Sequence, residues 1–124
     1  MIKSVGFVIG KDEYTHEEVV ERFRGQHVDL GKTLPNLVKY TTSVPKDPPG
    51  QVLHRDGGSS EFELPEDGLV EYDIISELWF ENWEDYREAF PSEASREAFK
   101  DEQEFVEEIY FLTAEEAVHV NGAE

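Results

Sequence analysis

The chain has 124 residues, a length that suits one domain built around a single hydrophobic core. It lacks cysteine, which excludes disulfides, thiolate metal ligands and a cysteine nucleophile, and which fits a reducing, cytoplasmic environment. Its 29 acidic and 11 basic residues give a net charge of -18, and so negative a surface repels nucleic acid and anionic membranes.

The first predicted element is a strand at residues 3–9, where Val5, Phe7 and Ile9 alternate with other side chains. This start lacks the charged, apolar and small-residue regions of a secretory signal. Nowhere does the sequence reach the run of about 18 apolar residues that a transmembrane helix needs. We expect a soluble protein with no membrane partner.

A helix is predicted after residue 15, because Thr15 and Glu18 have the spacing of a capping box. Its apolar stripe recurs at intervals of three and four residues and consists of Val19, Val20, Phe23, His27 and Leu30. His27 therefore lies one turn beyond Phe23 on the buried side of the helix. The helix is expected to end at Gly31 or at the corner of residues 34–36.

A second strand is predicted at residues 37–44, and Pro45 ends it. Residues 45–71 are rich in Pro, Gly, Asp and Ser, which favour turns. Connections longer than about 12–15 residues are usually functional or mobile. We interpret this long loop as a lid or dimer arm with a short strand at residues 51–53, or else as an idle surface insertion.

The clearest strand is predicted at residues 72–80, whose side chains alternate between two different faces. The apolar face carries Tyr72, Ile74, Leu78 and Phe80. The mixed face carries Asp73, Ile75, Glu77 and Trp79. Because this mixture suits neither a sealed core nor plain solvent, we expect the second face to border a wet cavity.

Two helices and a last strand complete the chain. Asn82 is expected to cap the first helix and Ser92 the second. The last strand is predicted to start within residues 109–112 and to extend to Val120 beyond a kink near Thr113.

The order of elements is strand, helix, strand, long loop, strand, helix, strand. This βαββαβ order is that of a ferredoxin-like α+β plait, in which the helices cover one face of an antiparallel sheet. The other face would carry Ile75, Trp79 and either Tyr40 or Leu37, too much apolar surface to leave in water. We therefore expect a homodimer in which two sheets pack face to face and form a dimeric α+β barrel.

His27 is the one histidine of four that falls on a predicted apolar stripe, where it would be either structural or a general acid or base. No histidines are spaced as metal ligands, so no metal site is predicted, and no nucleotide or phosphate motif suggests a cofactor. Asp73 and Glu77 share a strand face about 13 Å apart, too far to act as a pair. Each is a candidate lone base, or an interface carboxylate paired with a second subunit.

The acidic residues are spread along the whole chain and are not gathered in one tail. At 1 M salt the Debye length falls to about 3 Å, so repulsion between like charges is screened. We therefore expect a salt-adapted, halophilic protein. The alternative is an ordinary acidic protein with solvated faces.

Several segments together resemble the EthD family, which belongs to the dimeric α+β barrel superfamily. They are residues 15–27, 37–40, 72–73, 77–80 and 101–105, in this order. The resemblance covers nearly the whole chain apart from residues 45–71. This chain has Phe23 where the family usually has tryptophan, and Val28-Asp29 where it has a small residue and proline, so the pocket shape is expected to differ.

The resemblance implies a homodimer with a small, largely apolar cavity in each subunit. Relatives are linked to ether degradation beside a cytochrome P450 system, and others resemble decarboxylases or dehydratases of aromatic polyketides. The candidate catalytic residues are His27 and Asp73. The candidate substrate-binding residues are Phe23, Tyr40, Glu77 and Trp79.

Several functions fit this pattern. The first is a cofactor-independent enzyme or accessory protein for a small hydrophobic metabolite, with His27 as general acid or base and Tyr40 or Asp73 orienting the substrate. The second is a non-catalytic, dimeric binding or stress-response module in which His27 is structural. A cofactor-free monooxygenase of the same superfamily is a third.

Overall fold

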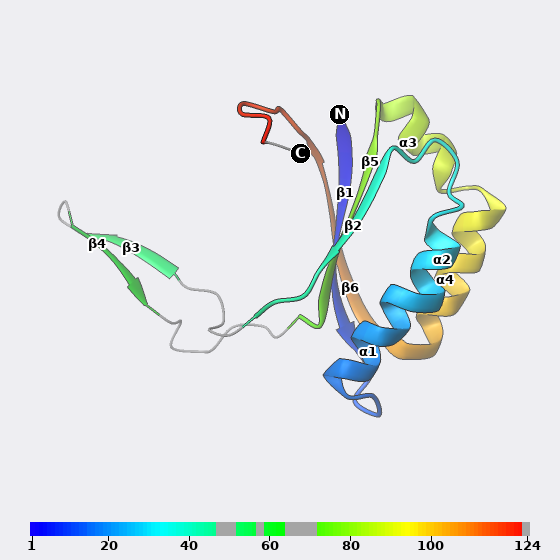
Figure 1. The fold of residues 1–124 in the computed structure, drawn as a ribbon, viewed down its shortest axis with the longest axis horizontal. Helices are drawn as coiled ribbons and strands as arrows, with labels where there is room; N and C mark the ends of the chain where they lie inside the picture. The colour runs from blue at the N-terminus through cyan, green and yellow to red at the C-terminus, as the bar shows by residue number, and fades with distance from the viewer. Residues whose placement is uncertain (47–51, 57–58, 64–71, 123–124) are drawn as a thin grey trace.

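The computed structural model describes residues 1–46, 52–56, 59–63 and 72–122. Its main sheet has four antiparallel strands in the order β2 (Lys39–Ser43), β5 (Ile74–Phe80), β1 (Ile2–Gly10) and β6 (Val106–Glu115). One face carries all the helices, which are α1 (His16–Arg22), η1 (Phe23–His27), α2 (Val28–Gly31), α3 (Trp83–Ala89) and α4 (Glu93–Phe105) (Figure 1). This arrangement confirms the predicted ferredoxin-like plait.

The hydrophobic core lies between the helices and the sheet. Val8 and Ile74 of the two central strands meet Val19, Phe23 and Phe105 of the helical layer, and each is at most 1% exposed. Full burial of such a side chain contributes about 1.5–3 kcal/mol. Ile74 and Phe80 of the apolar face predicted for residues 72–80 therefore lie on the side that the helices cover. Tyr72 does not, because the strand starts only at Ile74, and its ring lies 5.1 Å from that of Phe7 on the other face.

The first helix starts as the capping box predicts. Thr15 Oγ1 accepts a hydrogen bond from the Glu18 amide at 3.1 Å, and Glu18 Oε1 accepts one from the Thr15 amide at 2.9 Å. The helix is not uniform, because it widens into one π-helical turn in which the Val28 amide donates to the Phe23 carbonyl. Such turns are rare and often occur at functional sites. This one ends at His27, and the helix ends at Gly31 as predicted.

Helix α4 positions the acidic residues near its carboxyl end. Ser92 caps its amino end as predicted, since Ser92 Oγ accepts from the Ser95 amide at 3.2 Å. At the other end, Lys11 Nζ donates to the Gln103 carbonyl at 2.7 Å, a favourable place for a positive charge on a helix. Among the described helices, none combines the length and the apolar character needed to cross a membrane.

The region predicted as a long loop contains a hairpin. Strand β3 (Val52–Asp56) pairs with β4 (Ser59–Glu63) in a separate two-stranded sheet, which Figure 1 shows apart from the main sheet. The short strand predicted at residues 51–53 is thus longer than expected, and Gln51 lies outside the described residues. The choice between lid, dimer arm and idle insertion stays a prediction.

The last strand differs from its prediction at both ends. It begins at Val106, directly after α4 ends at Phe105, and no loop separates the two elements. It runs without a kink at Thr113, which pairs with Ser4 in regular register. It ends at Glu115, so the predicted extension to Val120 is wrong.

Candidate functional site

A small, partly open cavity of about 40 Å³ lies on the helix side of the sheet. Its polar lining comes from His27, Tyr40, Ser76, Ser95 and Glu102. The remaining walls are mostly apolar and include Leu34, Leu78, Phe90, Ala98, Phe99, Ile109 and Phe111. The polar groups are therefore few and set within an apolar surface, which is the usual character of a small-molecule site.

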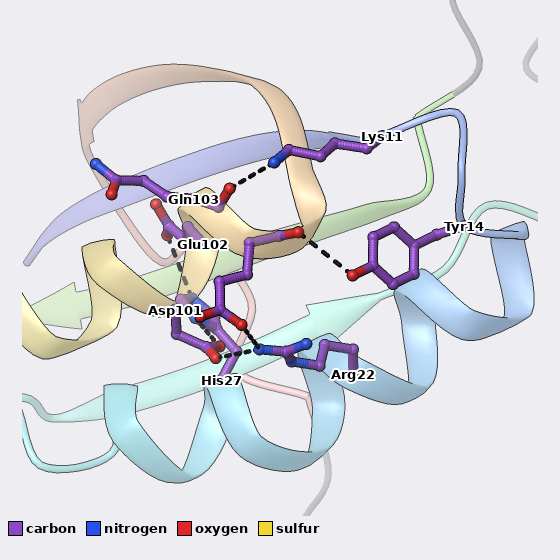
Figure 2. A network of polar contacts seen from close by, with 8 residues as sticks. Lys11, Tyr14, Arg22, His27, Asp101, Glu102 and Gln103 are labelled. Atoms are coloured by element: carbon purple, nitrogen blue, oxygen red, sulfur yellow. Dashed lines mark hydrogen bonds and ion pairs between the residues drawn. The ribbon is translucent and has the colours of Figure 1, made fainter.

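His27 lies between two carboxylates of α4. Its Nδ1 is 3.2 Å from Asp101 Oδ2, and its Nε2 is 3.2 Å from Glu102 Oε1 (Figure 2). A neutral imidazole has one N–H and can donate to only one of them. Asp101 Oδ2 is the hydrogen-bond partner of Nδ1, while Glu102 Oε1 lies beside Nε2 at the cavity wall. Within the described residues, no group of three or more His, Asp or Glu side chains has an arrangement that could hold a metal ion.

Asp101 holds the imidazole in place from behind. Its side chain is 3% exposed, and its Oδ1 accepts a hydrogen bond from Arg22 Nη2 at 2.8 Å. Arg22 also reaches Glu104 Oε2 at 3.2 Å, and its guanidinium lies 5.0 Å from the centre of the Phe105 ring. The hydrogen bonds to Asp101 and Glu104 raise the pKa of Arg22. Asp101 therefore joins the Arg22 guanidinium to the imidazole and gives Nδ1 of His27 a fixed partner.

Tyr40 supplies a phenol to the same cavity. Burial raises the pKa of its hydroxyl well above the ordinary value of 10.0, and the charge of Glu102 raises it further. The hydroxyl is therefore a proton-bearing donor at any physiological pH. Gly31 makes room for the ring, because a Cβ at that position would lie 2.8 Å from the nearest Tyr40 ring carbon.

Comparison with known proteins identifies the family. The profile described as the EthD domain matches residues 11–109, most of the chain. The chain belongs to the EthD family. No curated protein sequence matches this EthD chain significantly.

Several solved structures share the fold. An EthD family protein from Bacillus halodurans is 14% identical, with a TM-score of 0.67 over 94% of this chain and 99% of that one. A dimeric ferredoxin-like protein of unknown function from Thermobifida fusca is 12% identical, with a TM-score of 0.60 over 91% and 88%. SnoaB, a cofactor-independent oxygenase from Streptomyces nogalater, is 12% identical, with a TM-score of 0.52 over 96% and 97%. At these identities, the likeness shows the fold alone.

Two of the predicted site residues of this EthD chain meet at the cavity, and they are His27 and Tyr40. Tyr40 was predicted as one alternative for the face that carries Trp79, but it lies opposite Leu78 in the sheet register and so points to the helix side. Phe23 lies against His27, with ring centres 4.5 Å apart, but belongs to the sealed core. Its ring packs against the imidazole.

The structure places Glu77 and Trp79 on the opposite, open face of the sheet. Lys3 Nζ lies 3.3 Å from Glu77 Oε2, and Trp79 Nε1 donates to Glu116 Oε2 at 2.8 Å. Lys39 Nζ lies 4.7 Å from the centre of the Trp79 ring. These residues do not line the helix-side cavity, so their role in binding stays a prediction that depends on a second subunit.

Asp73 also lies away from the cavity. Its Oδ2 accepts a hydrogen bond from the Gly10 amide at 2.7 Å, and its Oδ1 is 2.8 Å from His16 Nδ1. Both oxygens are engaged in joining β5 to the end of β1 and the start of α1. The geometry favours a structural role for this carboxylate, and its catalytic role remains an untested prediction.

The partners of His27 were missed by sequence reasoning, although one signal was present. Asp101 precedes the apolar Phe105 by four residues on a helix, so both must share one face. A carboxylate beside a buried phenylalanine has to be paired. Its partners, however, come from another helix.

Proposed function

We propose that this EthD protein binds a small, largely apolar molecule in the helix-side cavity and moves a proton to or from it through His27 and Glu102. The supporting observation is the imidazole held between Asp101 and Glu102 at the wall of an apolar cavity. An imidazole and a carboxylate at the wall of a sheltered site can accept a proton from a bound molecule or give one to it. This transfer needs no cofactor.

Each side chain has a distinct part in the proposed step. Asp101, paired to Arg22, fixes the imidazole through Nδ1, while Nε2 and Glu102 face the cavity and exchange the proton with the ligand. The Tyr40 hydroxyl then donates to an oxygen of the ligand on which negative charge develops. Burial makes each of these interactions stronger than it would be in water.

The proton transfer can be tested with 5-nitrobenzisoxazole, a flat neutral molecule. Loss of its single C3–H proton to a base breaks the N–O bond and releases a coloured phenolate, so a spectrophotometer follows the reaction. We expect the wild-type protein to exceed both His27→Gln and Glu102→Gln by about 100-fold or more. Glu104→Gln, which alters an exposed partner of Arg22, is the matched control and should retain the wild-type rate.

A second function is favoured by the same contacts. Both nitrogens of His27 are already occupied by protein carboxylates, and the residue is 4% exposed, as a structural histidine would be. The protein would then be a non-catalytic binding module. Equal rates for the wild type and His27→Gln, with a lower melting temperature for the variant, would support this function and refute the first.

We also propose that the protein forms a homodimer through the open face of its sheet. Val5, Phe7, Ile75, Tyr110 and Leu112 share this face by register, and Tyr110 and Leu112 are about half exposed. The ferredoxin-like protein from Thermobifida fusca, which shares the fold, is described as dimeric. Light scattering at molar salt should give twice the chain mass, and a single chain mass would contradict the dimer.

A further inference from the structure

The helix-side cavity is too small for the molecule that the proposed function requires. A buried water needs about 10–15 Å³ of cavity volume, so about 40 Å³ holds about three or four waters. An organic ligand of ten or more heavy atoms does not fit unless a wall moves. The wall that moves most easily should therefore mark the entrance.

Two outer hollows flank the cavity on the helix side. One, of about 330 Å³, is lined by Phe99, Glu102, Ile109 and Phe111, all of which also line the cavity. The other, of about 350 Å³, shares Phe90, Phe99 and Phe111 with the cavity. Phe99 and Phe111 thus border all three spaces.

These two rings are also the least constrained part of the wall. Phe99 is 42% exposed and Phe111 is 54% exposed, whereas His27, Ser76 and Ser95 are buried. Phe111 belongs to β6, an edge strand of the sheet, and Phe99 to the facing helix α4. Exposed side chains change rotamer within nanoseconds, while buried ones are held by their neighbours.

We propose that Phe99 and Phe111 form a gate through which the ligand enters between α4 and β6. With both rings turned outward, the cavity joins the outer hollows into one site. The polar end of the ligand reaches His27 and Glu102, and its apolar body lies in the outer hollows. The gate rests on the proposed function for the identity of the inner site, and it stays open in the proposed dimer because it lies on the helix side.

The surroundings of the gate select the charge of the ligand. Glu102 and Glu107 line the first outer hollow, and the chain as a whole carries a net charge of -18. An anionic ligand is repelled on this route, whereas a neutral aromatic ring gains contact with both phenylalanines. The gate is therefore specific for neutral, flat molecules.

The absence of cysteine allows a direct test. Ser76→Cys places a single thiol on the floor of the cavity, where its rate of labelling by N-phenylmaleimide, a neutral flat reagent, measures entry. Adding Phe99→Ala or Phe111→Ala should raise this rate at least tenfold, and Phe99→Trp should lower it. Trp83→Ala removes another exposed aromatic side chain, which borders none of the three spaces, and should leave the rate unchanged.

Two further measurements separate the gate from its alternatives. A maleimide that carries a benzoate should label the same thiol more slowly than N-phenylmaleimide, and salt should narrow the difference. The gate would be overturned if Trp83→Ala raised the labelling rate as much as Phe99→Ala and Phe111→Ala do. It would also be overturned if Phe99→Ala and Phe111→Ala left the labelling rate unchanged while their melting temperatures matched that of the parent. Because labelling does not involve His27, this result is independent of the proton-transfer assay, and either proposal can fail alone.

Discussion

The two faces of the sheet differ in how far their charged side chains are exposed to solvent. On the helix side, Arg22, His27 and Asp101 form a cluster in which the Asp101 side chain is 3% exposed. On the open face, Lys3 and Glu77 form a pair whose side chains are about one quarter exposed. The His27 and Asp101 side chains have lost their water and depend on their protein partners, although Arg22 is 25% exposed. Lys3 and Glu77 can both exchange their partners for water. Charge on the helix side should therefore cost stability when it is disturbed, and charge on the open face should not.

The largest effect is expected at Asp101. Asp101→Asn preserves the size of the side chain but leaves Arg22 and His27 without the buried anion that pairs them. Breaking a buried ion pair costs about 3–5 kcal/mol, which urea unfolding would measure. Glu104→Gln is the matched control, because this other Arg22 partner is 70% exposed and should cost less than about 1 kcal/mol. Equal losses for the two variants would show that the cluster is not buried in solution.

Two glycines of the same helical stretch sharpen the contrast between cavity wall and surface. Gly31→Ala would place a methyl group 2.8 Å from the Tyr40 ring, and we expect a loss of about 1–3 kcal/mol as the ring is displaced. Gly25→Ala meets no atom within 4 Å and should instead stabilise the helix by up to about 1 kcal/mol. Thermal unfolding of both variants tests this. If Gly31→Ala were neutral, Tyr40 would not lie beneath α2.

Most of the fold could be predicted because it is written in local patterns. The capping box from Thr15 to Glu18 and the Asn82 and Ser92 caps depend on neighbours within four residues, and all are confirmed. The strand predicted at residues 72–80 is confirmed from Ile74 onward. The π-helical turn before His27 has no comparable local signal. The end of β6 is set by pairing with β1, so the apolar residues beyond it misled the prediction.

The candidate site was harder to predict, because its parts lie far apart in the sequence. Asp101 is 74 residues from His27, and only the packing of α4 against η1 brings the two side chains together. Tyr40 and Trp79 lie on opposite sides of the sheet because of the β2–β5 register, which a single sequence does not reveal. The mixed polar and apolar face predicted for residues 72–80 therefore did not indicate where the cavity lies, because the cavity is on the other side of the sheet.

Tyr40 gives the helix side a distinct response to pH. Its raised pKa means that the folded protein retains this proton where the unfolded chain releases it. The contribution to stability is complete below about pH 10 and is lost as the pH rises further towards the folded-state value. Between pH 9 and about pH 11, the free energy of unfolding of Tyr40→Phe should therefore fall by about 1 kcal/mol less than that of the wild type. Urea unfolding at both pH values measures this, and Tyr14→Phe, away from the cavity, is the control.

The smallest effect is expected on the open face. Lys3→Met breaks the pair with Glu77, and a partly exposed pair contributes at most about 1 kcal/mol. Salt should erase even this contribution to stability, because the Debye length falls from about 10 Å at 0.1 M to about 3 Å at 1 M.

If the chain is salt-adapted, the melting temperature of the wild type rises over the same range as its net charge of -18 is screened. Wild type and Lys3→Met should thus converge as both become more stable, while the Asp101→Asn deficit persists. A wild-type melting temperature that stays constant up to molar KCl would refute salt adaptation. A stability difference between the wild type and Lys3→Met that persists in high salt would mean that a second subunit buries this face.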